Sequence, residues 1–204
     1  RWLYFRWPDA WRRVAVLDCG LEEALLQLQP LEGFLHPRVL VASTALNGWS
    51  AVFNGRIHGL GGRGLSVRLS RALRVPGYFV AAAPPASDPE HFPGFRQFYV
   101  LGPQTGRDHV RAVWVSEEED VGRWHFGTDG EVQPYEDVEA YRRRRHTDRL
   151  TERMLVDYAA AVGLRPWEDS FYRPPFHLIT SLRLGHDRFQ RTLAQTRTEM
   201  KLDE

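Results

Sequence analysis

The glycine-rich stretch from Gly59 to Gly64, Gly-Leu-Gly-Gly-Arg-Gly, is one segment whose residue types could support chemistry. It precedes a predicted helix, and backbone N–H groups at the start of a helix can bind an anion. With His58 and Arg63, it could hold a phosphate-bearing substrate if a carboxylate joined them in one cleft. The spacing does not match Gly-x-Gly-x-x-Gly, and no Gly-Lys-Ser/Thr follows. A plain flexible loop is the simpler interpretation.

A second candidate is the run of four arginines from Arg142 to Arg145, which we place on a helix that begins near Tyr135. Guanidinium groups bind phosphates, so this helix could contact nucleic acid, with Arg142 and Arg144 as candidate contact residues. Four consecutive residues point in nearly every direction around a helix, however, and nearby acidic residues can neutralise them. A salt-bridged helix face is the simpler interpretation.

The other reactive residue types lack the arrangements that catalysis or metal binding requires. The eight histidines are scattered, and no pair has the i, i+4 helical spacing of a zinc site. There is no Gly-x-Ser-x-Gly motif, and the single cysteine, Cys19, excludes an intrachain disulfide and a cysteine-based zinc cluster. We therefore predict no catalytic residue, no metal ligand and no cofactor, and an enzyme is the less favoured class.

Aromatic residues crowd the first eleven positions of the chain, at Trp2, Tyr4, Phe5, Trp7 and Trp11. Alternate residues of this segment cannot all face one core. Some aromatic area could therefore remain for a partner protein, since Trp, Tyr and Arg are the usual anchors of protein interfaces. A strand buried on both faces explains the segment equally well.

Length and charge narrow the functional classes further. A chain of 204 residues, 43% of them hydrophobic, can bury a core of its own. Its formal net charge of +1 argues against a general nucleic-acid binder and against a membrane-surface protein. No apolar run reaches the roughly 18 residues needed to cross a bilayer, and the first residues lack the apolar region of a signal peptide. We expect a cytoplasmic protein without a membrane partner.

Short strands and short helices must position these residues. Apolar patterns predict strands at 3–5, 14–17, 39–42, 49–53, 78–83, 98–101, 110–115, around Trp124, and at 176–184. Amphipathic spacing predicts helices over 21–28, over 65–75 and from about 135 to 162, and the residues from 187 to 202 are helix-permissive.

Turn residues suggest how these elements connect. Asn47-Gly48 is a hairpin signal, and Gly127-Thr128-Asp129-Gly130 is predicted to be a turn. Hairpins between neighbouring strands favour an α+β fold with a mixed or mainly antiparallel sheet, helices packed on one side and a C-terminal helical segment. The expected organisation is a single α+β domain over 1–166 and a C-terminal extension over 167–204.

The order of these features resembles a set of small uncharacterised proteins of actinobacteria, of the streptomycete kind. The resemblance covers about residues 2 to 172. It rests on Tyr4-Phe5-Arg6-Trp7, Trp49-Ser50-Ala51-Val52, Leu65-Ser66, Leu69-Ser70-Arg71, Gly122 to Phe126, Gln133 to Tyr141, Asp148-Arg149-Leu150, Met154-Leu155 and Tyr158 to Gly163. These motifs are structural, so the resemblance implies no catalytic residue. The compact α+β pattern without a catalytic signature is also similar to immunity proteins of bacterial toxin systems such as the SUKH group.

Our leading hypothesis is a non-catalytic, immunity-type or regulatory protein that occludes a partner protein, such as a toxin, with an aromatic and arginine surface. One alternative is an enzyme that acts on a phosphate-bearing substrate through the Gly59–Gly64 loop. Another is nucleic-acid binding through the Arg142–Arg145 helix, which the net charge disfavours. The candidate binding residues are Trp2, Tyr4, Trp7, Trp11, His58, Arg63, Arg142 and Arg144.

Overall fold

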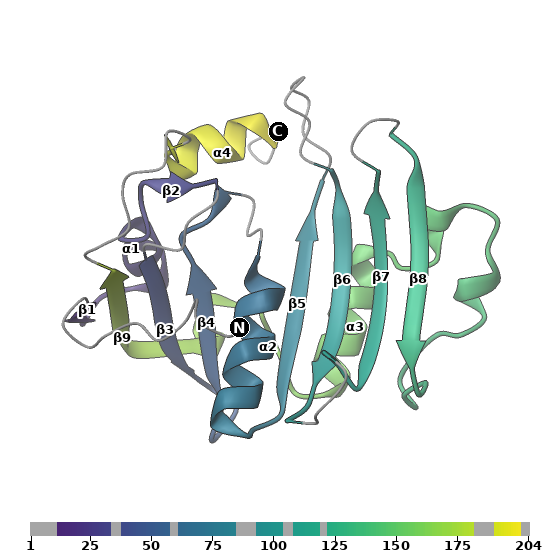
Figure 1. The fold of residues 1–204 in the computed structure, drawn as a ribbon, viewed down its shortest axis with the longest axis horizontal. Helices are drawn as coiled ribbons and strands as arrows, with labels where there is room; N and C mark the ends of the chain where they lie inside the picture. Colours follow the sequence, from purple (N-terminus) through teal and green to yellow (C-terminus); the bar gives the residue numbers. More distant parts are fainter. Residues whose placement is uncertain are drawn as a thin grey trace, which may run out of the picture. The chain divides into compact units, whose positions relative to one another are not determined.

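A computed structural model describes residues 12–33, 38–57, 61–84, 93–103, 108–118, 122–181 and 190–200 (Figure 1). The chain divides into two compact units. Unit 1 consists of residues 1–60 and 168–196, and unit 2 of residues 61–167 and 197–204. Each unit contains a four-stranded sheet in which the strand pairs are antiparallel. The predicted α+β class, with antiparallel sheets and a C-terminal helix, is confirmed.

In unit 1 the sheet has the strand order β1-β9-β3-β4. Its strands are β1 (Arg12–Leu17), β9 (Tyr172–Ser181), β3 (Arg38–Thr44) and β4 (Ser50–Asn54). The smaller elements are α1 (Leu21–Leu26), η5 (Asp169–Phe171) and a two-stranded pair of β2 (Leu31–Glu32) with β10 (Gln190–Arg191). The strand β9, from the predicted C-terminal extension, lies between β1 and β3. Helix α4 (Leu193–Glu199) follows β10.

The core of unit 1 lies on one face of its sheet. Leu40 and Ala42 of β3 are fully buried, and Phe176 of β9, which pairs with Ala42, is 1% exposed. The predicted hairpin turn joins β3 to β4, and Gly48 there has a φ of 77°, which favours glycine.

In unit 2 the strand order is β5-β6-β7-β8 (Figure 1). The strands are β5 (Gly77–Ala83), β6 (Phe95–Leu101), β7 (Arg111–Glu117) and β8 (Trp124–Gly130), and the helices are α2 (Gly62–Leu73) and α3 (Glu152–Ala161). Phe98 of β6 packs with the α3 residues Leu155 and Tyr158, whereas its neighbour Tyr99 packs with Val67 of α2. Because successive residues of a strand point to opposite faces, α2 and α3 cover opposite faces of this sheet.

The predicted turn at Gly127–Gly130 is wrong, because these residues continue the strand β8. Gly127 is paired with Trp114 of β7, and a Cβ atom there would lie 2.2 Å from Cζ2 of the Trp114 indole. Gly130 has a φ of 86°, and a Cβ atom there would lie 2.0 Å from the carbonyl oxygen of Val110. These glycines permit close approach of neighbouring groups within the sheet.

The predicted helix from about 135 to 162 is α-helical over 152–161, with the two 3₁₀ turns η3 (Ala140–Arg142) and η4 (His146–Asp148) before it. The prediction that Arg142–Arg145 form a helix is therefore wrong. Arg143 and Arg145 have extended ψ angles of 148° and 130°, which interrupt helical geometry. Hydrogen bonds that are not part of a helix override the local periodicity here, since Arg149 Nε donates to the Arg143 carbonyl oxygen at 2.7 Å and Arg96 Nη2 of β6 donates to the Thr147 carbonyl oxygen at 3.2 Å.

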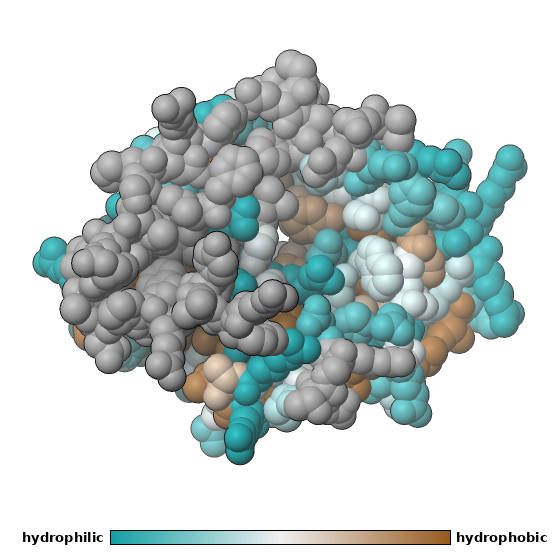
Figure 2. Space-filling model, in the orientation of Figure 1, coloured by the Kyte–Doolittle hydropathy of each residue, from teal (hydrophilic) through white to brown (hydrophobic). Residues whose placement is uncertain are grey.

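Hydrophilic residues cover most of the coloured surface on the face drawn in Figure 2, with smaller apolar areas between them. Among the described residues, no helix combines the length and the apolar character that a bilayer span requires.

Candidate functional site

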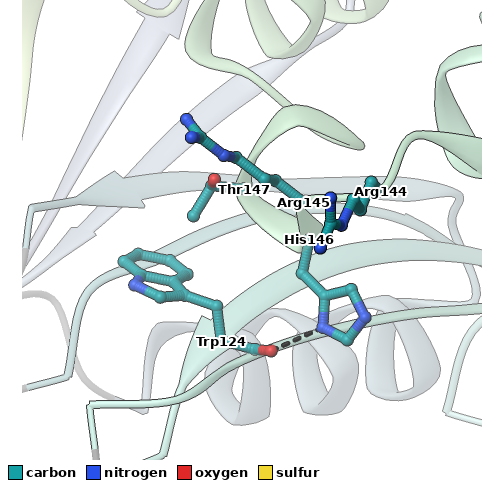
Figure 3. Close-up of a pocket in the computed structure, with 5 residues that line it drawn as sticks. All are labelled: Trp124, Arg144, Arg145, His146 and Thr147. Atoms are coloured by element: carbon teal, nitrogen blue, oxygen red, sulfur yellow. Dashed lines mark hydrogen bonds between the residues drawn. The ribbon is translucent and has the colours of Figure 1, made fainter.

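An open hollow of about 340 Å³ lies in unit 2 where β8 begins (Figure 3). We call it the Trp124 hollow, and it is lined by Trp124, Arg144, Arg145, His146 and Thr147. Trp124 is the first residue of β8, and the other four residues form the turn between η3 and η4 and the start of η4. The hollow therefore lies between the first residue of a strand and an irregular loop, and binding residues are common on such loops.

Arg96 of β6 fixes the loop to the sheet. Its guanidinium carbon lies 5.3 Å from the centre of the Trp124 ring, and the ring packs against the buried core on the α3 side of the sheet. Arg96 Nε donates to the Leu150 carbonyl oxygen at 2.7 Å, and its Nη2 donates to the Thr147 carbonyl oxygen at 3.2 Å. Burial lowers the pKa of Arg96, and the carboxylates of Glu152 and Asp148 act in the opposite direction. Arg96 thus supports the hollow without lining it.

His146 makes a second link between loop and strand. Its Nδ1 lies 2.5 Å from the carbonyl oxygen of Trp124 (Figure 3). A carbonyl oxygen can only accept a hydrogen bond, so Nδ1 is the donor and carries the hydrogen. The half-buried imidazole is thereby held in one orientation, with Nε2 on the opposite edge of the ring.

The four arginines of the run differ in their partners. Arg142 Nη1 lies 3.2 Å from Glu139 Oε2 in an exposed ion pair. Arg143 donates to the Asp148 carbonyl oxygen at 3.0 Å and lies 3.7 Å from the Asp137 carboxylate. Arg144 and Arg145 are exposed, and neither forms an ion pair or a side-chain hydrogen bond with any residue in the described ranges. The two unpaired guanidinium groups are the two that line the hollow.

These two guanidinium groups point away from each other. In Figure 3 the Arg145 side chain extends on the side of Thr147 and Trp124, and Arg144 lies on the side of His146. Each group presents several N–H donors in a planar fork that suits carboxylate or phosphate oxygens. The arrangement suits an extended ligand with separated negative charges better than a single compact anion.

A second polar cluster in unit 2 is closed to ligands. Both the Arg111 and Glu136 side chains are at most 2% exposed, and Arg111 Nε donates to Glu136 Oε1 at 2.8 Å. The Tyr141 hydroxyl donates to Glu136 Oε2 at 2.7 Å and lies 3.1 Å from the Tyr158 hydroxyl. The backbone N–H of Gln133 adds a further hydrogen bond to Glu136. Because its polar atoms satisfy one another, we interpret this cluster as structural.

The structure brings one of the sequence-predicted binding residues, Arg144, to the hollow. Arg142 lies outside it. Arg63 is in α2, where its guanidinium carbon lies 5.2 Å from the centre of the Tyr99 ring, on the other face of the sheet from the core that contacts Trp124. The remaining predicted binding residues lie outside the described residues, namely Trp2, Tyr4, Trp7, Trp11 and His58. Gly59 and Leu60 of the glycine loop also lie outside them.

Four lining residues were absent from the predicted set: Trp124, Arg145, His146 and Thr147. Arg145 and His146 adjoin the predicted Arg144, so extending that prediction along the chain would have found them. No sequence pattern links Trp124 to a residue 22 positions later, because their contact depends on the tertiary fold.

Within the described parts of the chain, no three or more His, Cys, Asp and Glu side chains are grouped so that they could hold a metal ion. No protein-family model, curated protein or solved structure matches the chain. Function is therefore inferred from the chemistry of the Trp124 hollow.

Proposed function

We propose that this is a non-catalytic binding protein that recognises an acidic segment of a partner protein through the Trp124 hollow. The observation that carries this proposal is the pair of exposed guanidinium groups of Arg144 and Arg145, which no carboxylate of the described residues neutralises. Exposed arginines beside a tryptophan are typical anchors of protein interfaces. Carboxylates of a partner would form charge-assisted hydrogen bonds with both groups.

The lining residues favour binding over catalysis. They include no carboxylate, and Nδ1 of the one histidine is already hydrogen-bonded to Trp124. The open form of the hollow and the divergence of its two arginines favour a macromolecular ligand over a small substrate. The net charge of +1 favours a protein over nucleic acid, because nucleic-acid binding domains usually carry a marked positive excess.

The resemblance to immunity proteins implies the form that this binding would take. An immunity-type or regulatory protein covers a functional surface of its partner, so it needs contact residues and no reaction chemistry. On this proposal the partner is a toxin or a regulated protein in the cytoplasm, and its acidic segment lies in or beside the surface that becomes occluded.

The test compares two variants with the wild-type protein. Binding of a fluorescein-labelled deca-glutamate peptide is measured by fluorescence anisotropy at about pH 8, where histidine is neutral. Replacing both residues (Arg144→Ala with Arg145→Ala) should raise the Kd about tenfold or more, because it removes two charge-assisted contacts. The control is Arg142→Ala, which removes one positive charge nearby but outside the hollow, and it should change the Kd less than about twofold.

Two results would contradict the proposal. If the Arg142→Ala variant lost as much affinity per arginine as the double variant, the attraction would be general electrostatics without a site. If a single-stranded oligo-dT of ten nucleotides bound more tightly than the peptide and lost affinity in the double variant, the ligand would be nucleic acid.

A further inference from the structure

We infer that one carboxylate of the ligand lies between the Arg144 guanidinium and Nε2 of His146, and that His146 takes up a proton when the ligand binds. This inference rests on the proposed function and deepens it. The ligand group at this position is an oxyanion. His146 is added as a binding residue that is protonated when the ligand is bound.

The hydrogen bond to Trp124 determines the protonation pattern of the ring. Because Nδ1 donates to the Trp124 carbonyl oxygen, the hydrogen of a neutral imidazole lies on Nδ1. Nε2 then carries a lone pair, which repels a carboxylate. Only the protonated ring can donate from both nitrogens at once, keeping the Trp124 contact while it binds an anion through Nε2.

The groups around His146 favour this assignment. Arg144 and His146 line the same hollow, and in Figure 3 the Arg144 side chain lies on the side of His146, whereas the Arg145 side chain extends toward Thr147. From β8, the His125 ring lies 6.3 Å away, and its Nε2 is already 2.9 Å from the Glu118 carboxylate. The His146 segment itself contributes Arg144, Arg145, Thr147 and Asp148.

No carboxylate of the described residues forms an ion pair with His146. A carboxylate placed at Nε2 by the ligand would be the first opposite charge in contact with that edge of the ring. An opposite charge within about 4 to 6 Å favours the charged form of a titratable group, so ligand binding and protonation of His146 are linked.

The proton uptake can be measured directly. Isothermal titration of the intact protein with deca-glutamate at about pH 6.5, in PIPES and in Bis-Tris, separates the heat of buffer ionisation from the heat of binding. We expect net proton uptake on binding, seen as an observed heat that changes with the ionisation enthalpy of the buffer. The Kd should fall about three- to tenfold from about pH 8 to about pH 5.5, where the glutamate peptide itself stays mostly ionised.

Two single variants identify the histidine. His146→Asn keeps an amide donor for the Trp124 carbonyl oxygen but has no titrating ring, so it should show neither proton uptake nor the fall in Kd between about pH 8 and about pH 5.5. The control is His125→Asn, which removes the neighbouring histidine and should retain both effects.

The outcomes separate this inference from the proposed function. Binding at pH 8 that depends on Arg144 and Arg145, with equal proton uptake by the wild type and the His146→Asn variant, would overturn the inference and leave the proposed function standing. Failure of the wild type to bind the peptide at either pH would overturn both. Loss of proton uptake in the His125→Asn variant would transfer the role to His125 and contradict the assignment of His146.

Discussion

At the scale of single residues, the buried ion pair of Arg111 and Glu136 should be the most sensitive point of unit 2. The Glu136 side chain is 1% exposed and accepts hydrogen bonds from Arg111 and Tyr141. The change Glu136→Gln would leave a buried guanidinium without its counter-charge. We expect it to lower the free energy of unfolding by about 3 kcal/mol or more, measured by urea denaturation.

The matched control for that change is Glu139→Gln. Glu139 also pairs with an arginine, but its side chain is 74% exposed, so the variant should lose less than about 0.5 kcal/mol. Equal losses in the two variants would mean that burial does not decide the strength of these pairs.

The same carboxylate should make stability depend on acid pH. Burial by itself raises the pKa of Glu136, but hydrogen bonds from Arg111, Tyr141 and the Gln133 backbone outweigh it and hold the pKa below its ordinary value. The unfolded chain then binds this proton more readily than the folded one. The stabilisation is complete above the unfolded pKa of about 4.3 and is lost as pH falls through the folded value. The difference in urea midpoint between wild type and Glu136→Gln should therefore shrink below about pH 4, and a difference that grew there would contradict the assignment.

At the scale of secondary-structure elements, replacing two glycines by alanine should change the stability of the protein in opposite directions. Gly127→Ala in β8 would place a methyl group inside the Trp114 indole, so we expect a loss of about 1 to 3 kcal/mol as the ring is displaced. Gly64→Ala in α2 meets only the Arg68 guanidinium at 3.7 Å, an ordinary contact, and should stabilise the helix by about 0.5 to 1 kcal/mol. Thermal unfolding of both variants checks the pair, and destabilisation by Gly64→Ala would contradict the expected helical propensity.

The elements that the sequence predicts correctly are those defined by local pattern. The apolar run 14–17 and the acidic-start helix at 21–28 correspond to β1 and α1 because their neighbours in sequence determine their periodicity. The stretch 140–148 could not be predicted in this way. Its conformation depends on hydrogen bonds from Arg96 to Thr147 and from His146 to Trp124, which join segments distant in sequence.

The same distinction applies to the candidate site. Arg144 could be predicted, because a run of arginines is visible in the sequence. The expected neutralisation by nearby acidic residues is found for two of the four arginines, since Arg142 pairs with Glu139 and Arg143 lies 3.7 Å from the Asp137 carboxylate. With helical spacing, the nearby acidic residues are expected to neutralise all four arginines. The interrupted backbone instead leaves Arg144 and Arg145 without such partners among the described residues.

At the scale of the whole molecule, charge balance should make binding only moderately sensitive to salt. The chain has 27 Lys and Arg residues against 26 Asp and Glu, so long-range attraction contributes little and the salt dependence should arise from the local contacts of the Trp124 hollow. Two arginine contacts predict that the Kd for deca-glutamate rises at most about tenfold between about 50 and 200 mM NaCl. The double replacement of Arg144 and Arg145 should nearly abolish that dependence.

A nucleic-acid binder that neutralises several phosphates would behave differently, because each contact releases condensed counterions. Its affinity for single-stranded DNA would fall by a factor of about a thousand or more over the same salt range. A loss of that size for oligo-dT, together with little binding of the peptide, would replace the acidic protein segment by a nucleic acid as ligand. A modest salt dependence of the Kd that disappears when Arg144 and Arg145 are replaced would support a local protein interface, since only those two arginines would then contribute electrostatically to binding.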